Sequence, residues 1–126
     1  MAVSITSQTS PYVDKLIVDT ETDNTANTAV FSGAAATMYI YDIDNSDNVS
    51  AAVGKFYDNA NPTVGGNSSP TEPDIILTVP KLVRQTVTVH DGITFGSDFS
   101  FACTVGADTA NAVPPTNKVT FRIMAE

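Results

Sequence analysis

Apolar side chains recur at every second position in several stretches of the chain, and this period constrains the fold more than any other feature. In DFSFACTV, Phe99, Phe101 and Cys103 alternate with residues whose side chains are smaller or more polar. The stretch KVTFRIM, residues 118–124, alternates in the same way. Successive side chains of a β-strand point to opposite faces of its sheet, so each stretch predicts a strand with one buried face and one face in water.

Two further stretches, residues 74–79 and 85–90, repeat this alternation and predict two more strands. The stretch TMYIYDI, residues 37–43, differs because its centre, from Met38 to Tyr41, is entirely apolar. A continuous apolar run of this length predicts a strand that is covered on both faces.

Clusters of Asn, Asp, Gly and Pro separate the predicted strands, and these residue types favour turns. The clusters occupy residues 44–48, 58–62, 65–70 and 90–92. Two longer polar segments, residues 19–27 and 107–117, predict exposed loops.

The resulting count is about eight short strands at spacings of about 8–15 residues, which is typical of an all-β sandwich or barrel. A chain of 126 residues has room for one core of ordinary size. We therefore predict an all-β fold, a single-domain antiparallel β-sandwich of jelly-roll or immunoglobulin-like type. Residues 1–11 are predicted to form an N-terminal arm, and residues 12–126 the sandwich domain.

Charge and composition exclude several classes of function. Fourteen acidic residues against six basic ones give a net charge of −8, so we expect neither nucleic acid nor anionic membrane surfaces among the partners. No apolar run approaches the roughly 20 residues that span a bilayer. The N-terminal sequence MAVSITSQTSPYV has no basic and no apolar segment, so we expect no signal peptide. The single cysteine, Cys103, excludes an intrachain disulfide and is predicted to be a small buried side chain.

Acidic residues near one predicted turn resemble the start of a calcium-binding loop. Asp42, Asp44 and Asp47 supply hard oxygen ligands, but the segment has no Gly at the sixth position and no Glu at the twelfth. We favour a turn here and predict neither a metal nor a cofactor. His90 and Asp91 would form half of a catalytic pair, but a surface turn is the favoured interpretation. We therefore predict no catalytic residues.

Two groups of residues are candidates for binding a partner. Tyr39, Tyr41 and Tyr57 are predicted to share one partly exposed face, although packing in the core or at an edge is favoured over ligand stacking. Val3 and Ile5 alternate with polar residues in the N-terminal arm. Such an arm can add a strand to the exposed sheet edge of a neighbouring molecule.

An ordered set of short motifs resembles a group of small virion structural proteins encoded by tailed bacteriophages, often of aquatic hosts. The motifs are YDIDN (41–45), KFYD (55–58), PTVG (62–65), PDIIL (73–77), DGITF (91–95) and the pair Pro114-Pro115 before a terminal strand. The resemblance covers about residues 36–124 and consists of turns and core positions, so it carries over no functional residues.

What the resemblance implies is a non-enzymatic decoration, or cement, protein that binds the outer surface of a phage capsid and stabilises it. Its partner would be the major capsid protein or another virion protein, and self-association as a dimer or trimer is expected. Its location would be the virion, assembled in the cytoplasm of the host bacterium. Two alternatives stay open, a neck, tail or fibre-attachment protein and a surface carbohydrate- or receptor-binding module. A hydrolase is disfavoured because no acidic residue lies in an apolar stretch.

Overall fold

A computed structural model describes residues 3–7, 15–29, 35–66 and 68–126 of the chain. These residues form β-strands and no helix, so the predicted all-β sandwich is confirmed, with nine strands rather than about eight. No helix that could cross a membrane occurs in these ranges. The strands are β1 (Val3–Ser7), β2 (Lys15–Thr22), β3 (Asn27–Ala29), β4 (Ala36–Asp44), β5 (Ala52–Tyr57), β6 (Ile75–Val79), β7 (Arg84–Phe95), β8 (Phe99–Thr104) and β9 (Val119–Ala125).

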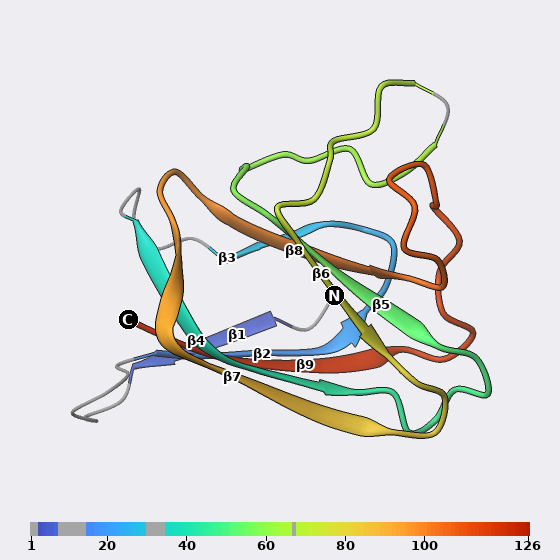
Figure 1. Cartoon of the computed structure of the whole chain (residues 1–126), viewed down its shortest axis with the longest axis horizontal. Helices are drawn as coiled ribbons and strands as arrows, with labels where there is room; N and C mark the ends of the chain where they lie inside the picture. Colours follow the sequence, from blue (N-terminus) through green and yellow to red (C-terminus); the bar gives the residue numbers. More distant parts are fainter. Residues whose placement is uncertain (1–2, 8–14, 30–34, 67) are drawn as a thin grey trace.

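The strands form two antiparallel sheets that pack face to face (Figure 1). Sheet A has the order β1-β2-β9-β4-β7, and sheet B has the order β3-β8-β5-β6. Strand β2 pairs with β9, β4 with β7, and β5 with β6, while β3 pairs with β8. These nested pairs are those of one long hairpin rolled up on itself, which is the jelly roll. Of the two predicted sandwich types, the strand order therefore selects the jelly roll, with β1 added at the edge of sheet A.

Aromatic rings from both sheets fill the space between them. Phe101 of β8 stacks on Phe121 of β9 with ring centroids 5.6 Å apart. The edge of Tyr41 meets the ring of Phe56 at a centroid distance of 4.8 Å. All four side chains are buried, so the inward faces predicted for β8 and β9 are confirmed. Large rings in edge-to-face and offset contact supply most of the apolar area of such a core.

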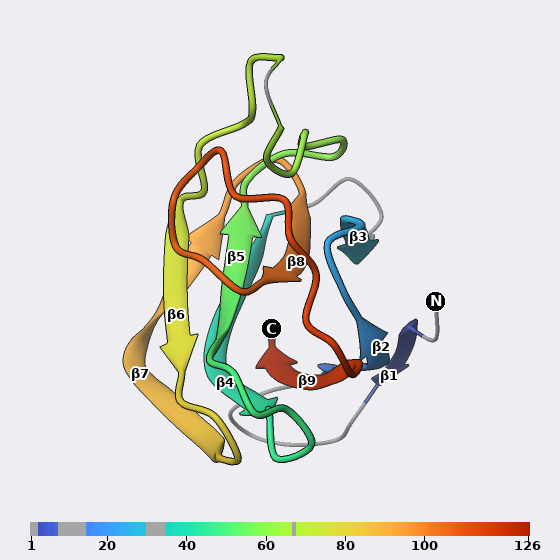
Figure 2. The same cartoon turned by 90° about the vertical axis from the view of Figure 1, so that its right-hand side faces the viewer.

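The outward face of β8 does not contact water as predicted. Ser100, Ala102 and Thr104 are all completely buried. Figure 2 shows the long β8–β9 loop running past β5 and β8, and this loop is hydrogen-bonded to a side chain of β5. The alternation along β8 reports correctly which side chains face sheet A, but it contains no information about a loop that folds back over the opposite face.

Residues 37–43 lie in strand β4 as predicted, but the prediction that this strand is covered on both faces is wrong. Strand β4 contains a bulge at Tyr39, because Met38 pairs with Ala125 of β9 while Ile40 pairs with the adjacent Met124. The extra residue shifts the alternation, so Met38 and Tyr41 both face the core while Ile40 is partly exposed on the outer face. The uninterrupted apolar run therefore reflects a bulge and a partly exposed outer face.

The predicted turn at residues 90–92 is instead part of strand β7. His90 and Asp91 lie in a bulge between the two stretches of β7 that pair with β4. Gly92 has a φ angle of +71°, and a Cβ atom there would lie 2.3 Å from Cγ2 of Thr37. Glycine is the residue that meets both requirements, so this Gly marks a bulge within the strand rather than its end.

Residues 19–27 form the second half of one strand, a short connection and the start of another strand, not the predicted long loop. Strand β2 continues to Thr22, and β3 begins at Asn27. The buried carboxylate of Asp19 accepts hydrogen bonds from the side-chain amide of Asn27 and, at 2.8 Å, from the backbone N–H of Glu21. Polar groups can be buried when they are hydrogen-bonded in this way, which is why polar composition alone was a poor guide here.

Candidate docking surface at one end of the sandwich

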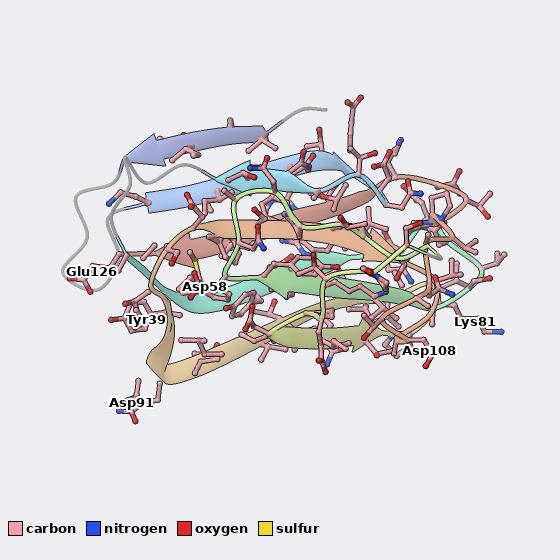
Figure 3. All side chains as sticks on the ribbon, turned by 90° about the horizontal axis from the view of Figure 1, so that it is seen from above. Tyr39, Asp58, Lys81, Asp91, Asp108 and Glu126 are labelled. Carbon is pink, nitrogen blue, oxygen red and sulfur yellow. The ribbon has the colours of Figure 1, made fainter. Side chains whose placement is uncertain are left out.

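Four connections, β2–β3, β4–β5, β6–β7 and β8–β9, lie at the same end of the jelly roll. Figures 1 and 2 both show the β4–β5 and β6–β7 loops side by side at this end. In Figure 3, Lys81 of the β6–β7 loop lies at the opposite end of the molecule from Tyr39, Asp91 and Glu126. The loops at this end are connected to one another by side-chain hydrogen bonds to backbone.

Asn45 holds the β4–β5 and β6–β7 loops together. Its backbone N–H donates to the carbonyl oxygen of Val83 at 2.9 Å. Its buried side-chain amide donates to the carbonyl oxygens of Ser50 and Pro80, each at 3.0 Å. One asparagine thus supplies donors to both loops, which fixes their relative position.

Two further asparagines, Asn48 and Asn117, connect these two loops to the β8–β9 loop. The side-chain amide of Asn48 donates to the carbonyl oxygen of Asn117 at 3.0 Å, and its Oδ1 accepts from the backbone N–H of Asn117 at 2.7 Å. The side chain of Asn117 also donates to the carbonyl oxygen of Asp47 at 2.6 Å. The three loops are therefore one hydrogen-bonded unit, where the sequence predicted only a turn.

The β4–β5 and β6–β7 loops of this unit carry three exposed large apolar side chains, and we call them the end patch: Val49, Leu82 and Val83. Their exposed fractions are 75%, 59% and 37%. The backbone N–H of Leu82 donates to the carbonyl oxygen of Asn48 at 3.0 Å, which places Leu82 beside Val49. Exposed apolar side chains on a rigid support are typical of a protein interaction surface.

Leu82 also has a strained backbone. Its φ angle is +58°, in the left-handed region that residues other than Gly and Asn rarely adopt. Strain of this kind persists where the surroundings enforce it, and it is commonest at functional sites. Leu82 is not among the site residues predicted from the sequence. The available signal was the segment Pro80 to Arg84, which connects two predicted strands without any Gly, Asn or Asp.

The three candidate tyrosines do not share an exposed face, and the favoured interpretation, packing in the core or at an edge, holds for Tyr41 and Tyr57. Tyr41 and Tyr57 are each only 1% exposed. Burial raises the pKa of both phenols, that of Tyr57 to about 12. Tyr39 is partly exposed, and its hydroxyl donates to the carboxylate of Glu126 at 3.2 Å. The bulge at Tyr39 turns Tyr41 to the core, and Tyr57 lies on the covered outer side of sheet B.

Two of the three carboxylates considered as calcium ligands, Asp42 and Asp44, have partners within the protein. Asp42 accepts from Arg84 Nε at 2.9 Å and from Thr86 Oγ1 at 2.9 Å. Asp44 accepts from the hydroxyl and the backbone N–H of Ser46, and these hydrogen bonds lower the pKa of its carboxyl group. Asp47 is exposed in the β4–β5 loop. The described residues contain no group of three His, Cys, Asp or Glu side chains that could hold a metal ion.

Nε2 of His90 lies 4.0 Å from Oδ1 of Asp91, and the two side chains are 99% and 98% exposed. Neither is held against another element, so they provide no fixed catalytic geometry. Cys103 is completely buried, and burial raises the pKa of its thiol to about 12. Its predicted role as a small buried side chain is confirmed.

Part of the predicted N-terminal arm is strand β1, which pairs with β2 of the same chain. Val3 packs against the core from this strand, and Ile5 is 43% exposed. Residues 1–2 and 8–11 of the arm lie outside the described residues. Among the described strands, β1 is an edge strand of sheet A.

Comparison of the chain with protein-family models, with curated proteins and with solved structures finds no match.

Proposed function

We propose that the chain is a non-enzymatic structural protein of a tailed-phage virion, a decoration protein that binds the outer surface of the capsid and stabilises it. The observation that carries this proposal is the end patch, in which Leu82 is exposed and strained on a hydrogen-bonded support. The motif resemblance over about residues 36–124 supplies the class of partner. The capsid contact would be made by the end patch.

A rigid apolar patch suits this role energetically. Side chains that are ordered before binding lose less conformational entropy when they bind. Repeated copies on one lattice add avidity, so each contact can be modest. Binding to the assembled capsid stabilises it by linkage. The net charge of −8 keeps the protein from adhering to the packaged genome.

The two alternative functions require different binding surfaces or copy numbers. A neck or tail protein would use the same kind of surface and differs mainly in how many copies each particle carries. The carbohydrate-binding alternative depended on an exposed face made by Tyr39, Tyr41 and Tyr57. Because two of these rings are buried, no observation now favours it.

The number of copies per purified virion tests the proposal. Quantitative gel analysis or cryo-EM occupancy should give hundreds of copies for a decoration protein, against about six or twelve for a neck or tail component. Absence of the chain from the particle would reject both.

A variant tests the role of the end patch. Asn is polar but tolerates the left-handed conformation, so Leu82→Asn should leave the fold intact. We expect it to reduce occupancy on capsids that lack the chain by at least about tenfold, equivalent to about 1.4 kcal/mol. The matched control is Ile76→Thr, at an exposed apolar position of β6. Equal occupancy for both variants would contradict a capsid contact through the end patch.

A further inference from the structure

The bulge in strand β7 contains the one Asp-Gly sequence of the chain, Asp91-Gly92. The register between β4 and β7 skips residues 89–92 of β7, which stand opposite the single residue Tyr39 of β4. A stretch of backbone that is not paired residue by residue with its neighbouring strand is a local weak point in the sheet. Little free energy is needed for the backbone to move at such a point.

The side chain of Asp91 is free to rotate. It is 98% exposed, and Figure 3 shows it projecting away from the sandwich. Nε2 of His90 lies 4.0 Å from Oδ1 of Asp91, which is beyond hydrogen-bond distance. Among the described residues, no hydrogen bond holds this carboxylate. The carboxyl carbon, Cγ, can therefore turn toward the backbone nitrogen of the next residue.

The packing of β7 on β4 requires that this next residue be glycine. A Cβ atom at position 92 would lie 2.3 Å from Cγ2 of Thr37 and 2.8 Å from Cε1 of Tyr39. The φ angle of +71° at Gly92 also favours glycine. Because glycine has no side chain, nothing on the residue itself hinders an approach to its backbone nitrogen. The fold thus places the least hindered backbone nitrogen directly after a free carboxyl group.

We propose that Asp91 is a modification site, at which the folded protein converts aspartate to isoaspartate through a cyclic succinimide. The backbone nitrogen of Gly92 forms a bond to Cγ of Asp91, and its proton leaves with the hydroxyl of the protonated carboxyl group and a second proton as water. Water then adds to one of the two ring carbonyls. If the bond from nitrogen to Cγ breaks, aspartate is restored. If the bond from nitrogen to the backbone carbonyl carbon breaks, isoaspartate forms, and the main chain runs through Cβ and Cγ. The ring closes within one dipeptide, so water is the one co-reactant.

Asn45, which is followed by Ser46, supplies a comparison within the same chain. An asparagine closes the same ring with loss of ammonia, but the Asn45 side chain is completely buried and donates to the carbonyl oxygens of Ser50 and Pro80. The loops must open before this ring can form, so folding should slow the reaction at Asn45 at least about a hundredfold. At Asp91 local motion is enough, so folding should slow the reaction by no more than about tenfold.

Incubation of the full chain in water labelled with heavy oxygen tests the proposal. One sample is folded, and a reference sample is unfolded in guanidinium chloride. Electron-transfer fragmentation of the digested chain distinguishes isoaspartate from aspartate at residue 91, and it also detects deamidation at residue 45. The heavy oxygen marks conversion during the incubation and excludes conversion during the digest. We expect labelled isoaspartate at residue 91 in the folded sample, at a rate within about tenfold of the unfolded reference.

The matched control is Asp91→Glu, which retains an exposed carboxylate but would have to close a larger and less favourable ring. This variant should fold like the wild type, as judged by circular dichroism, and should gain no label at residue 91. The proposal is overturned if the folded wild type forms no labelled isoaspartate at this residue, or if Asp91→Glu gains as much label there. Equal slowing of the reactions at Asp91 and Asn45 by folding would also overturn it, because both would then proceed through the unfolded chain.

Discussion

The ammonium group of Lys55 lies 2.7 Å from the backbone carbonyl oxygen of Asp108, and this hydrogen bond ties strand β5 to the β8–β9 loop. The same ammonium group donates to the carbonyl oxygen of Asn111 at 3.0 Å. Lys55 is completely buried, which is rare for lysine, and burial lowers the pKa of its ammonium group. A buried cation thus holds the loop that covers sheet B.

Replacing this lysine should loosen the loop. Lys55→Met retains the aliphatic volume but leaves the carbonyl oxygens of Asp108 and Asn111 without this donor. We expect the free energy of unfolding to fall by about 2 kcal/mol, with relief of the buried charge offsetting part of the loss. Urea unfolding measures this, and limited proteolysis should show faster cleavage within residues 105–118. The exposed-site control Lys81→Met should change stability by less than about 0.5 kcal/mol. A Lys55→Met protein as stable as the wild type would show that the hydrogen bonds do not hold the loop.

Stability should fall at alkaline pH because of Tyr57. Burial raises its pKa from the usual 10.0 to about 12. The unfolded chain therefore loses this proton first, so the stabilisation is complete below pH 10 and is lost as the pH rises toward 12. The full effect of such a shift is about 3 kcal/mol. Tyr57→Phe should reduce the decline between pH 10 and 12, measured by urea unfolding, but not remove it, because burial also raises the pKa of Tyr41. Tyr39→Phe should retain the decline of the wild type. Parallel curves for the wild type and Tyr57→Phe would contradict this prediction.

Asp58 should contribute to stability against acid. Its carboxylate accepts hydrogen bonds from the backbone N–H groups of Ser97 at 2.8 Å, Gly96 at 3.0 Å and Asp98 at 3.2 Å. These hydrogen bonds hold its pKa below 3.8, so the stabilisation is present above that pH and is lost as the pH falls through the lower folded-state value.

Asp58→Asn should therefore weaken the dependence of stability on pH below about 4. At neutral pH it should reduce stability by at most about 1 kcal/mol, because the carboxylate is exposed to solvent. Asp91→Asn, at a side chain that is 98% exposed, serves as the control and should match the wild type. Acid titration followed by circular dichroism distinguishes the two variants, and identical acid midpoints would count against this role.

The Leu82 side chain should not be needed for stability, even though its backbone conformation is unusual for leucine. With a φ angle of +58°, replacement by Gly removes the steric strain while adding freedom to the unfolded chain. We expect Leu82→Gly to be as stable as the wild type or more stable by up to about 1 kcal/mol. Val83→Gly, whose backbone has no such strain, should lose about 1 kcal/mol. A large loss in Leu82→Gly would mean that this leucine serves the fold and not a partner.

Several strands were predictable because strand alternation is a local property. Phe99 and Phe101 face the core, and so do Phe121 and Ile123, as their spacing of two indicates. Side chains alternate in direction along a pleated strand, so the spacing of apolar residues in the sequence indicates directly which of them face the core. The Asx-rich turn at residues 44–48 was predictable for the same local reason.

The features that carry the functional argument were not predictable from residue patterns. The end patch exists because Asn45 and Asn48 connect loops that are far apart in the chain. Asparagine is common in ordinary turns, so the sequence does not show that these two residues link loops. Tyr41 was misplaced because one bulge residue shifts the alternation of β4, and the position of a bulge is set by the partner strands.

By itself, the amino-acid sequence determined that the chain is all-β, where several strands lie, which faces of β8 and β9 enter the core, and that the surface is acidic. Only the tertiary structure decided the jelly-roll pairing order, the burial of the outer face of sheet B and the alignment of Leu16, Met124 and Ile40 across three strands. The reason is that strand pairing and loop coverage depend on contacts between residues distant in the chain, whereas alternation and turns depend on neighbours.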